Sequence, residues 1–134
     1  MRHAKRGDAT EALDVALWLL GIAAVIGSGL AIQFLRGPAA ARPNWLAPLV
    51  HGAFGAGGLA VLFVALSHGP PPSAMGTAGF GMAAALLLSL ALALGLFVGY
   101  ATFRRRRPAG LLVAVHASLA VAGFVALWTL VSLC

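Results

Sequence analysis

Four long apolar runs, separated by short stretches with arginine, proline or glycine, constrain this chain more than any other feature. The runs cover residues 13–35, 45–66, 77–103 and 109–133. Each has about 20 or more residues, the length that an α-helix needs to cross roughly 30 Å of hydrocarbon. None shows the alternation of a membrane β-strand. We therefore predict an all-α fold, a transmembrane four-helix up-down bundle in one domain, residues 1–134.

The composition excludes the main alternatives to a membrane protein. Of the 134 residues, 61% are hydrophobic and 9% are charged, whereas soluble domains have about a quarter charged residues. Disordered chains are poor in apolar residues, so disorder is excluded as well. The net charge of +6 lies in short clusters beside the apolar runs, which argues against a nucleic-acid partner. The partner that the composition predicts is the lipid bilayer.

Clusters of arginine after the first and third runs predict the orientation. The first of these connections carries two arginines and the second carries four in a row, against three basic residues in the N-terminal stretch. Because basic residues in short loops favour the cytoplasmic side, we expect both connections in the cytoplasm and both termini outside. The arginines can also bind anionic lipid headgroups. They are Arg36, Arg42, Arg104, Arg105, Arg106 and Arg107.

A repeated pattern links the second and fourth runs. Residues 51–58 (HGAFGAGG) align without a gap with residues 116–123 (HASLAVAG). Both segments read as histidine, two small residues, a large apolar residue, and then mostly small residues ending in glycine. The first and third runs match less well, and glycine- and alanine-rich helices align easily. The pattern predicts two helical hairpins repeated in parallel.

Two histidines supply the only ionisable chemistry deep in the runs. His51 and His116 lie about seven residues after the second and fourth runs begin. In an up-down bundle these helices point the same way, so the two imidazoles are expected at one depth, about 10 Å from the basic connections. An intramembrane histidine usually faces the bundle interior and marks a functional site. Small residues follow each histidine on its own helix face: Gly55, Gly58, Ala120 and Gly123.

The number of ligands selects the expected cofactor. Haem iron needs only two axial protein ligands, whereas a zinc site wants three or four. The sequence has no Cys-x-x-Cys-His motif, which excludes covalent c-type attachment. We therefore expect haem b, with His51 and His116 as axial ligands and the four small residues lining the macrocycle. No catalytic residue is predicted.

A second interpretation involves no cofactor. His51 and His116 can instead form hydrogen bonds across helices, to Ser118, to Thr129 or to backbone carbonyls. The protein would then be a non-catalytic subunit that assembles with other membrane proteins. His68 is expected to be a solvated loop residue at the opposite interface. Small residues at four-residue spacing in the first run predict helix packing: Ala23, Gly27 and Ala31.

With His51 and His116 in small-residue helices, the chain resembles small bacterial four-helix membrane cytochromes b, the cytochrome b561-like group. The resemblance covers the four spans in general pattern. It implies haem b between paired histidines, a bacterial inner membrane, and electron transfer involving a quinol or a partner protein. That group typically has two histidine pairs, and His68 lacks an intramembrane mate. The resemblance therefore implies a one-haem electron-transfer subunit with a redox partner or other membrane subunits, not a complete enzyme.

Overall fold

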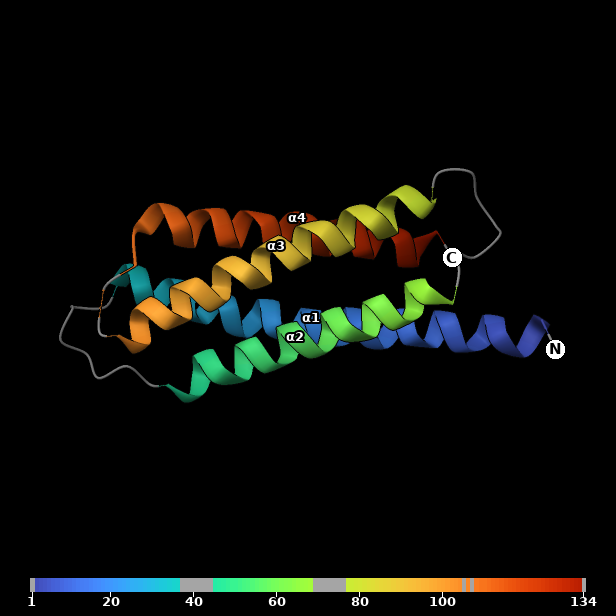
Figure 1. Cartoon of the computed structure of the whole chain (residues 1–134), viewed down its shortest axis with the longest axis horizontal. Helices are drawn as coiled ribbons and strands as arrows, with labels where there is room; N and C mark the ends of the chain where they lie inside the picture. The colour runs from blue at the N-terminus through green and yellow to red at the C-terminus, as the bar shows by residue number, and fades with distance from the viewer. Residues whose placement is uncertain (1, 37–44, 69–76, 105, 107, 134) are drawn as a thin grey trace.

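The computed structural model describes residues 2–36, 45–68, 77–104, 106 and 108–133, and these ranges contain four α-helices (Figure 1). The helices are α1 (Arg2–Arg36), α2 (Leu46–Ser67), α3 (Thr77–Phe103) and α4 (Gly110–Ser132). The predicted all-α four-helix fold is confirmed. Each helix contains a stretch long and apolar enough to span a bilayer: Ala9–Arg36, Leu46–Ser67, Gly79–Phe103 and Gly110–Ser132. The chain is a multi-pass integral membrane protein.

The first helix is longer than the apolar pattern predicts. It begins at Arg2 rather than at residue 13, although its membrane-spanning part begins only at Ala9. Apolar residues mark the part of a helix that lies in lipid, whereas alanine, lysine, arginine and glutamate favour helix in water too. These residues dominate positions 2–12, so the helix continues beyond the span.

The helices form two antiparallel hairpins that stack on each other. α1 packs along α2 and α3 along α4, and the hairpins meet through α1 with α4 and α2 with α3. Within the described ranges the backbones of the diagonal pairs, α1 with α3 and α2 with α4, do not approach each other. Figure 1 shows the two hairpins as two layers. We call the end of the bundle where α1 and α3 finish the arginine end, and the opposite one the terminal end.

The apolar core occupies only the half of the bundle nearest the terminal end. Leu62 of α2 and Leu127 of α4 are its largest fully buried side chains. Ala23 is the last buried residue of α1, and Ala91 is the last buried residue of α3. Beyond these two residues, towards the arginine end, none of the four helices has a buried residue in its described part. The two hairpins are therefore not closed on each other by an apolar core in that half. The core residues are Leu13, Ala16, Leu20, Leu59, Leu62, Ala65, Ala84, Ala85, Leu88, Leu127 and Leu130.

The outward faces carry large apolar side chains on all four helices. Val25, Phe63, Leu86 and Leu111 are examples, and each is at least half exposed. A soluble protein rarely leaves so much contiguous apolar surface open to water. These faces are suited to lipid, in agreement with the length of the spans.

The two hairpins repeat each other in their packing. Gly58 of α2 lies against Leu20 of α1, and Gly123 of α4 lies against Leu88 of α3. A Cβ at either glycine would stand 2.6 or 2.7 Å from the leucine Cγ, so the small residue permits the close approach. The connection between α3 and α4 is shorter than the one between α1 and α2. An ungapped alignment that matches α2 with α4 therefore puts α1 out of register with α3, and this hides the α1–α3 repeat in the sequence.

Candidate functional site: a pair of histidines

His51 is held by the neighbouring helix of its own hairpin. Its Nδ1 lies 2.8 Å from the carbonyl oxygen of Ala23 on α1. One turn further along α1, Gly27 leaves space for the ring, because a Cβ there would stand 2.7 Å from His51 Cε1. The imidazole is thus fixed by a carbonyl and by the absence of a side chain.

His116 repeats this arrangement in the other hairpin. Its Nδ1 lies 2.8 Å from the carbonyl oxygen of Ala91 on α3. Gly95 of α3 takes the place of Gly27, since a Cβ there would stand 2.8 Å from His116 Cε1. Both histidines are partly buried. Two independent hairpins therefore place an imidazole in the same way.

The carbonyl partners determine which ring nitrogen is available. A carbonyl oxygen only accepts hydrogen bonds, so the Nδ1 of each histidine must carry the proton and donate it. In the neutral ring the Nε2 then carries the free lone pair. A histidine that donates from one nitrogen to a carbonyl and offers the other is the usual arrangement of a metal ligand.

The two imidazoles meet between the hairpins. They come from α2 and α4, which are diagonal in the bundle, and their ring centroids lie 6.1 Å apart with an angle of 85° between the planes. The prediction that His51 and His116 lie together at one depth is confirmed. They lie in the half of the bundle that has no buried apolar core.

The small residues predicted to line the site separate into two groups. Gly58 and Gly123 are buried against leucines of the adjacent helix, so their surroundings are those of packing positions. Gly55 and Ala120 are partly exposed, and a Cβ at Gly55 would meet no atom within 4 Å. Of the four residues, Gly55 and Ala120 are the two that are not buried, and Gly55 is the one shown to have open space beside it.

The hydrogen-bonding interpretation holds for the backbone carbonyls and not for the two side chains named with them. Thr129 donates to the Val125 carbonyl of its own helix, and Ser118 is exposed. Both histidines use Nδ1 for a hydrogen bond across helices. Their Nε2 atoms remain available, so these hydrogen bonds are compatible with binding of a metal ion by Nε2. His68 caps the end of α2, is exposed, and donates from Nδ1 to the Val64 carbonyl.

The sequence predicts backbone carbonyls as possible partners of the histidines but does not identify Ala23 and Ala91 as the residues that supply them. It also does not predict Gly95 or the ring contact of Gly27, since the spacing of Ala23 and Gly27 indicates only helix packing. A backbone carbonyl gives no signal of its own in a sequence. Aligning the first and third runs so that Gly27 matches Gly95 also pairs Ala23 with Ala91, and this alignment would have found them.

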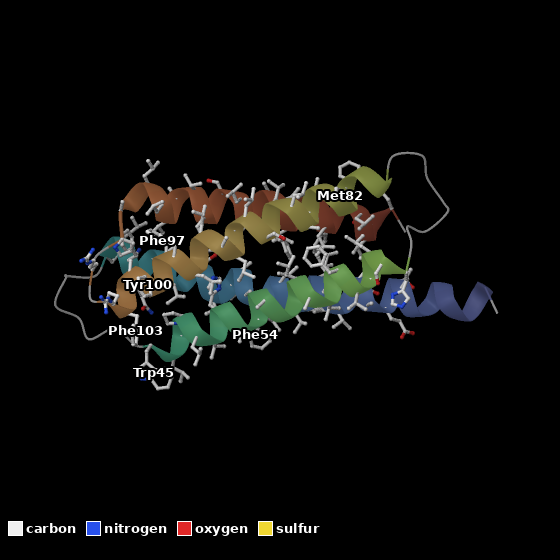
Figure 2. All side chains as sticks on the ribbon, in the orientation of Figure 1. Trp45, Phe54, Met82, Phe97, Tyr100 and Phe103 are labelled. Atoms are coloured by element: carbon white, nitrogen blue, oxygen red, sulfur yellow. The ribbon has the colours of Figure 1, made fainter. Side chains whose placement is uncertain are left out.

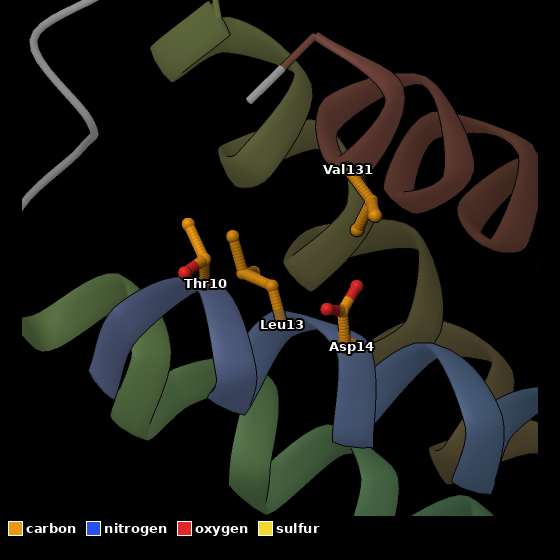
Figure 3. A pocket seen from close by; sticks show the side chains of 4 residues that line it. All are labelled: Thr10, Leu13, Asp14 and Val131. Carbon is orange, nitrogen blue, oxygen red and sulfur yellow. The ribbon is translucent and has the colours of Figure 1, made fainter. Parts of the chain in front are cut away.

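A small pocket lies at the other end of the bundle. Thr10, Leu13 and Asp14 of α1 line it together with Val131 near the end of α4 (Figure 3). It offers one carboxylate. No group of three histidine, cysteine, aspartate or glutamate side chains arranged to hold a metal ion occurs anywhere in the described part of the chain. The histidine pair is therefore the stronger candidate for a functional site.

Comparison of the chain with protein-family models, with curated proteins and with solved structures gives no match.

Proposed function

We propose that the protein binds one haem b between its two hairpins and serves as an electron-transfer subunit of a membrane assembly. The Nε2 atoms of His51 and His116 would be the two axial ligands. The observation that carries the proposal is the meeting of two imidazoles from diagonal helices, each with its Nδ1 engaged by a carbonyl.

The spacing of the rings supports a shared iron. Two imidazoles that bind one metal ion on opposite sides, with bonds of about 2.0–2.1 Å, have ring centroids about 6 Å apart. The centroids of His51 and His116 are 6.1 Å apart. Haem supplies four ring nitrogens of its own, so two protein ligands complete its coordination. The donor set thus fits haem better than a metal ion held by protein alone.

The packing around the pair also supports a planar apolar ligand. Such a ligand needs space between the hairpins, and this half of the bundle has no buried apolar core among its described residues. Gly55 and Ala120 follow the histidines on their own helix faces and are not buried, and a Cβ at Gly55 would meet no atom within 4 Å. Gly58 and Gly123 contribute by holding each hairpin tightly packed.

Haem iron would supply one-electron oxidation and reduction, and the protein would hold and tune it. The hydrogen bonds from Nδ1 to the carbonyls of Ala23 and Ala91 fix the orientation of both imidazoles and make them more basic ligands. A single haem near one end of the bundle must exchange electrons with a partner, so we infer a subunit rather than a complete enzyme.

An optical spectrum tests the proposal. The full chain is purified in detergent after expression with haem precursor, and its spectrum is recorded oxidised and after dithionite reduction. We expect a red protein whose visible bands sharpen on reduction, as low-spin iron with two histidine ligands does. A colourless, stable, helical protein would contradict the haem proposal and favour a cofactor-free assembly subunit.

We also propose that the arginine end faces the cytoplasm of a bacterial cell and that both termini lie outside. Cys134 is the only cysteine, so a membrane-impermeant maleimide added to spheroplasts should label it without lysis. A variant that combines Cys134→Ser with Ala109→Cys carries its cysteine at the arginine end and should be labelled only after lysis. If Cys134 were labelled only after lysis and the Ala109→Cys variant without lysis, the proposed orientation would be wrong and the termini would lie in the cytoplasm.

A further inference from the structure

A surface patch of aromatic and basic side chains lies where α2 begins and α3 ends. Trp45, Tyr100 and Phe103 are all exposed there, by 72%, 60% and 84%. Arg104 and Arg106 are also exposed, and the Arg104 guanidinium lies 5.9 Å from the centroid of the Tyr100 ring. Figure 2 shows the three aromatic residues gathered at this end of the bundle. We call these five residues the α2–α3 patch.

The internal repeat shows that the aromatic residues of the patch have no aromatic counterparts at the matching positions of the repeat. When Gly27 is matched with Gly95 and His51 with His116, Arg104 of the patch has Arg36 as its counterpart, and Arg106 corresponds to Pro38. The aromatic rings have none, because Tyr100, Phe103 and Trp45 correspond to Ile32, Leu35 and Gly110. Orientation in the membrane requires only the positive charge. The aromatic rings beside it call for a different explanation.

The positive charge of the patch has no acidic partner among the residues that the structure describes. The three acidic residues of the sequence are Asp8, Glu11 and Asp14. All three lie in the first half of α1, towards the terminal end, and the patch lies at the arginine end (Figure 1). An anion that neutralises Arg104 and Arg106 must therefore come from outside the protein.

We propose that the α2–α3 patch binds the headgroup phosphate of an anionic phospholipid. Tryptophan and tyrosine at the ends of spans sit at the level of the headgroups. An arginine guanidinium can donate two parallel hydrogen bonds to a phosphate, and basic residues beside a span attract anionic lipids. The contact of Arg104 with the Tyr100 ring holds the guanidinium at that level. This proposal does not depend on haem.

Quenching of one tryptophan tests the proposal. Of the three tryptophans, Trp18→Phe and Trp128→Phe remove two, which leaves Trp45 within the patch. The full chain is reconstituted in phosphatidylcholine vesicles with a small, equal fraction of brominated phosphatidylglycerol or brominated phosphatidylcholine. We expect the anionic lipid to be enriched at Trp45 on the order of fivefold over the zwitterionic one.

Two variants distinguish specific lipid binding at the α2–α3 patch from a general attraction of anionic lipid by positive charge. Arg104→Gln should bring the two quenching efficiencies close to each other, whereas Arg36→Gln, the matching position at the end of α1, should leave the preference unchanged. Equal quenching by both lipids in the starting protein, or an equal loss in both variants, would overturn the proposal. If inorganic phosphate at millimolar concentration abolishes the preference, the site binds free phosphate and the lipid assignment is wrong.

Discussion

Replacing both histidines with alanine, His51→Ala together with His116→Ala, is expected to give a colourless protein that still folds as a helical membrane protein. The change removes both proposed axial ligands. It also removes two hydrogen bonds across helices, but in a membrane each is worth only about 0.6 kcal/mol on average. The apolar core lies in the other half of the bundle and is untouched. Absorbance and circular dichroism of the purified protein measure pigment and fold together.

The single variants sharpen this test. Because the two hairpins hold their histidines in the same way, His51→Ala and His116→Ala should behave alike, each converting low-spin six-coordinate iron to high-spin iron with one ligand. His68→Ala is the control, since His68 bonds only within its own helix end and should leave the spectrum unchanged. A low-spin spectrum retained by the double variant would refute the ligand assignment.

Adding one methyl group at Gly27 or Gly95 is expected to weaken haem binding by about 10- to 100-fold, the usual effect of disturbing the groups that orient a metal ligand. The new Cβ would stand 2.7 or 2.8 Å from the histidine Cε1, inside van der Waals contact. The ring must then move, and its hydrogen bond to the carbonyl of Ala23 or Ala91 is lost. Titration of the haem-free protein with haem measures the affinity.

Matched glycines on the same helices provide the control. Gly29 on α1 and Gly99 on α3 have open space where a Cβ would be added, so Gly29→Ala and Gly99→Ala should leave haem affinity unchanged. All four changes improve helix propensity by the same amount, roughly 1 kcal/mol. If the two pairs of variants behave alike, Gly27 and Gly95 do not position the histidines.

The sequence predicts most of the fold because a membrane imposes a simple rule. Every span must be apolar and about 20 residues long, so the ends of three helices agree with the apolar runs to within a residue or two. The apolar pattern does not predict the start of α1, because residues 2–8 are helical outside the span. Their helix depends on backbone propensity, which the apolar pattern does not report.

The candidate site could be predicted only in part. His51 and His116 stand out because a histidine in a span is costly and the repeat places the two at one depth. Each imidazole is positioned by a backbone carbonyl and by a glycine that leaves space for the ring. Neither feature can be recognised from the type of side chain in the sequence. Gly58 and Gly123 lie on the same helix faces as the histidines, yet Leu20 and Leu88 fill the space beside them. Only the packing of the hairpins shows which small residues leave room.

Electron paramagnetic resonance of the oxidised, haem-loaded protein tests the central claim most directly. The two imidazole planes are 85° apart. If both rings bound the iron in this orientation, two iron d orbitals would be nearly equal in energy, and the low-spin signal would be strongly anisotropic. The account therefore predicts a strongly anisotropic low-spin ferric signal that disappears in His51→Ala and in His116→Ala. A high-spin signal alone, or a weakly anisotropic low-spin signal that survives either substitution, would contradict ligation by this pair.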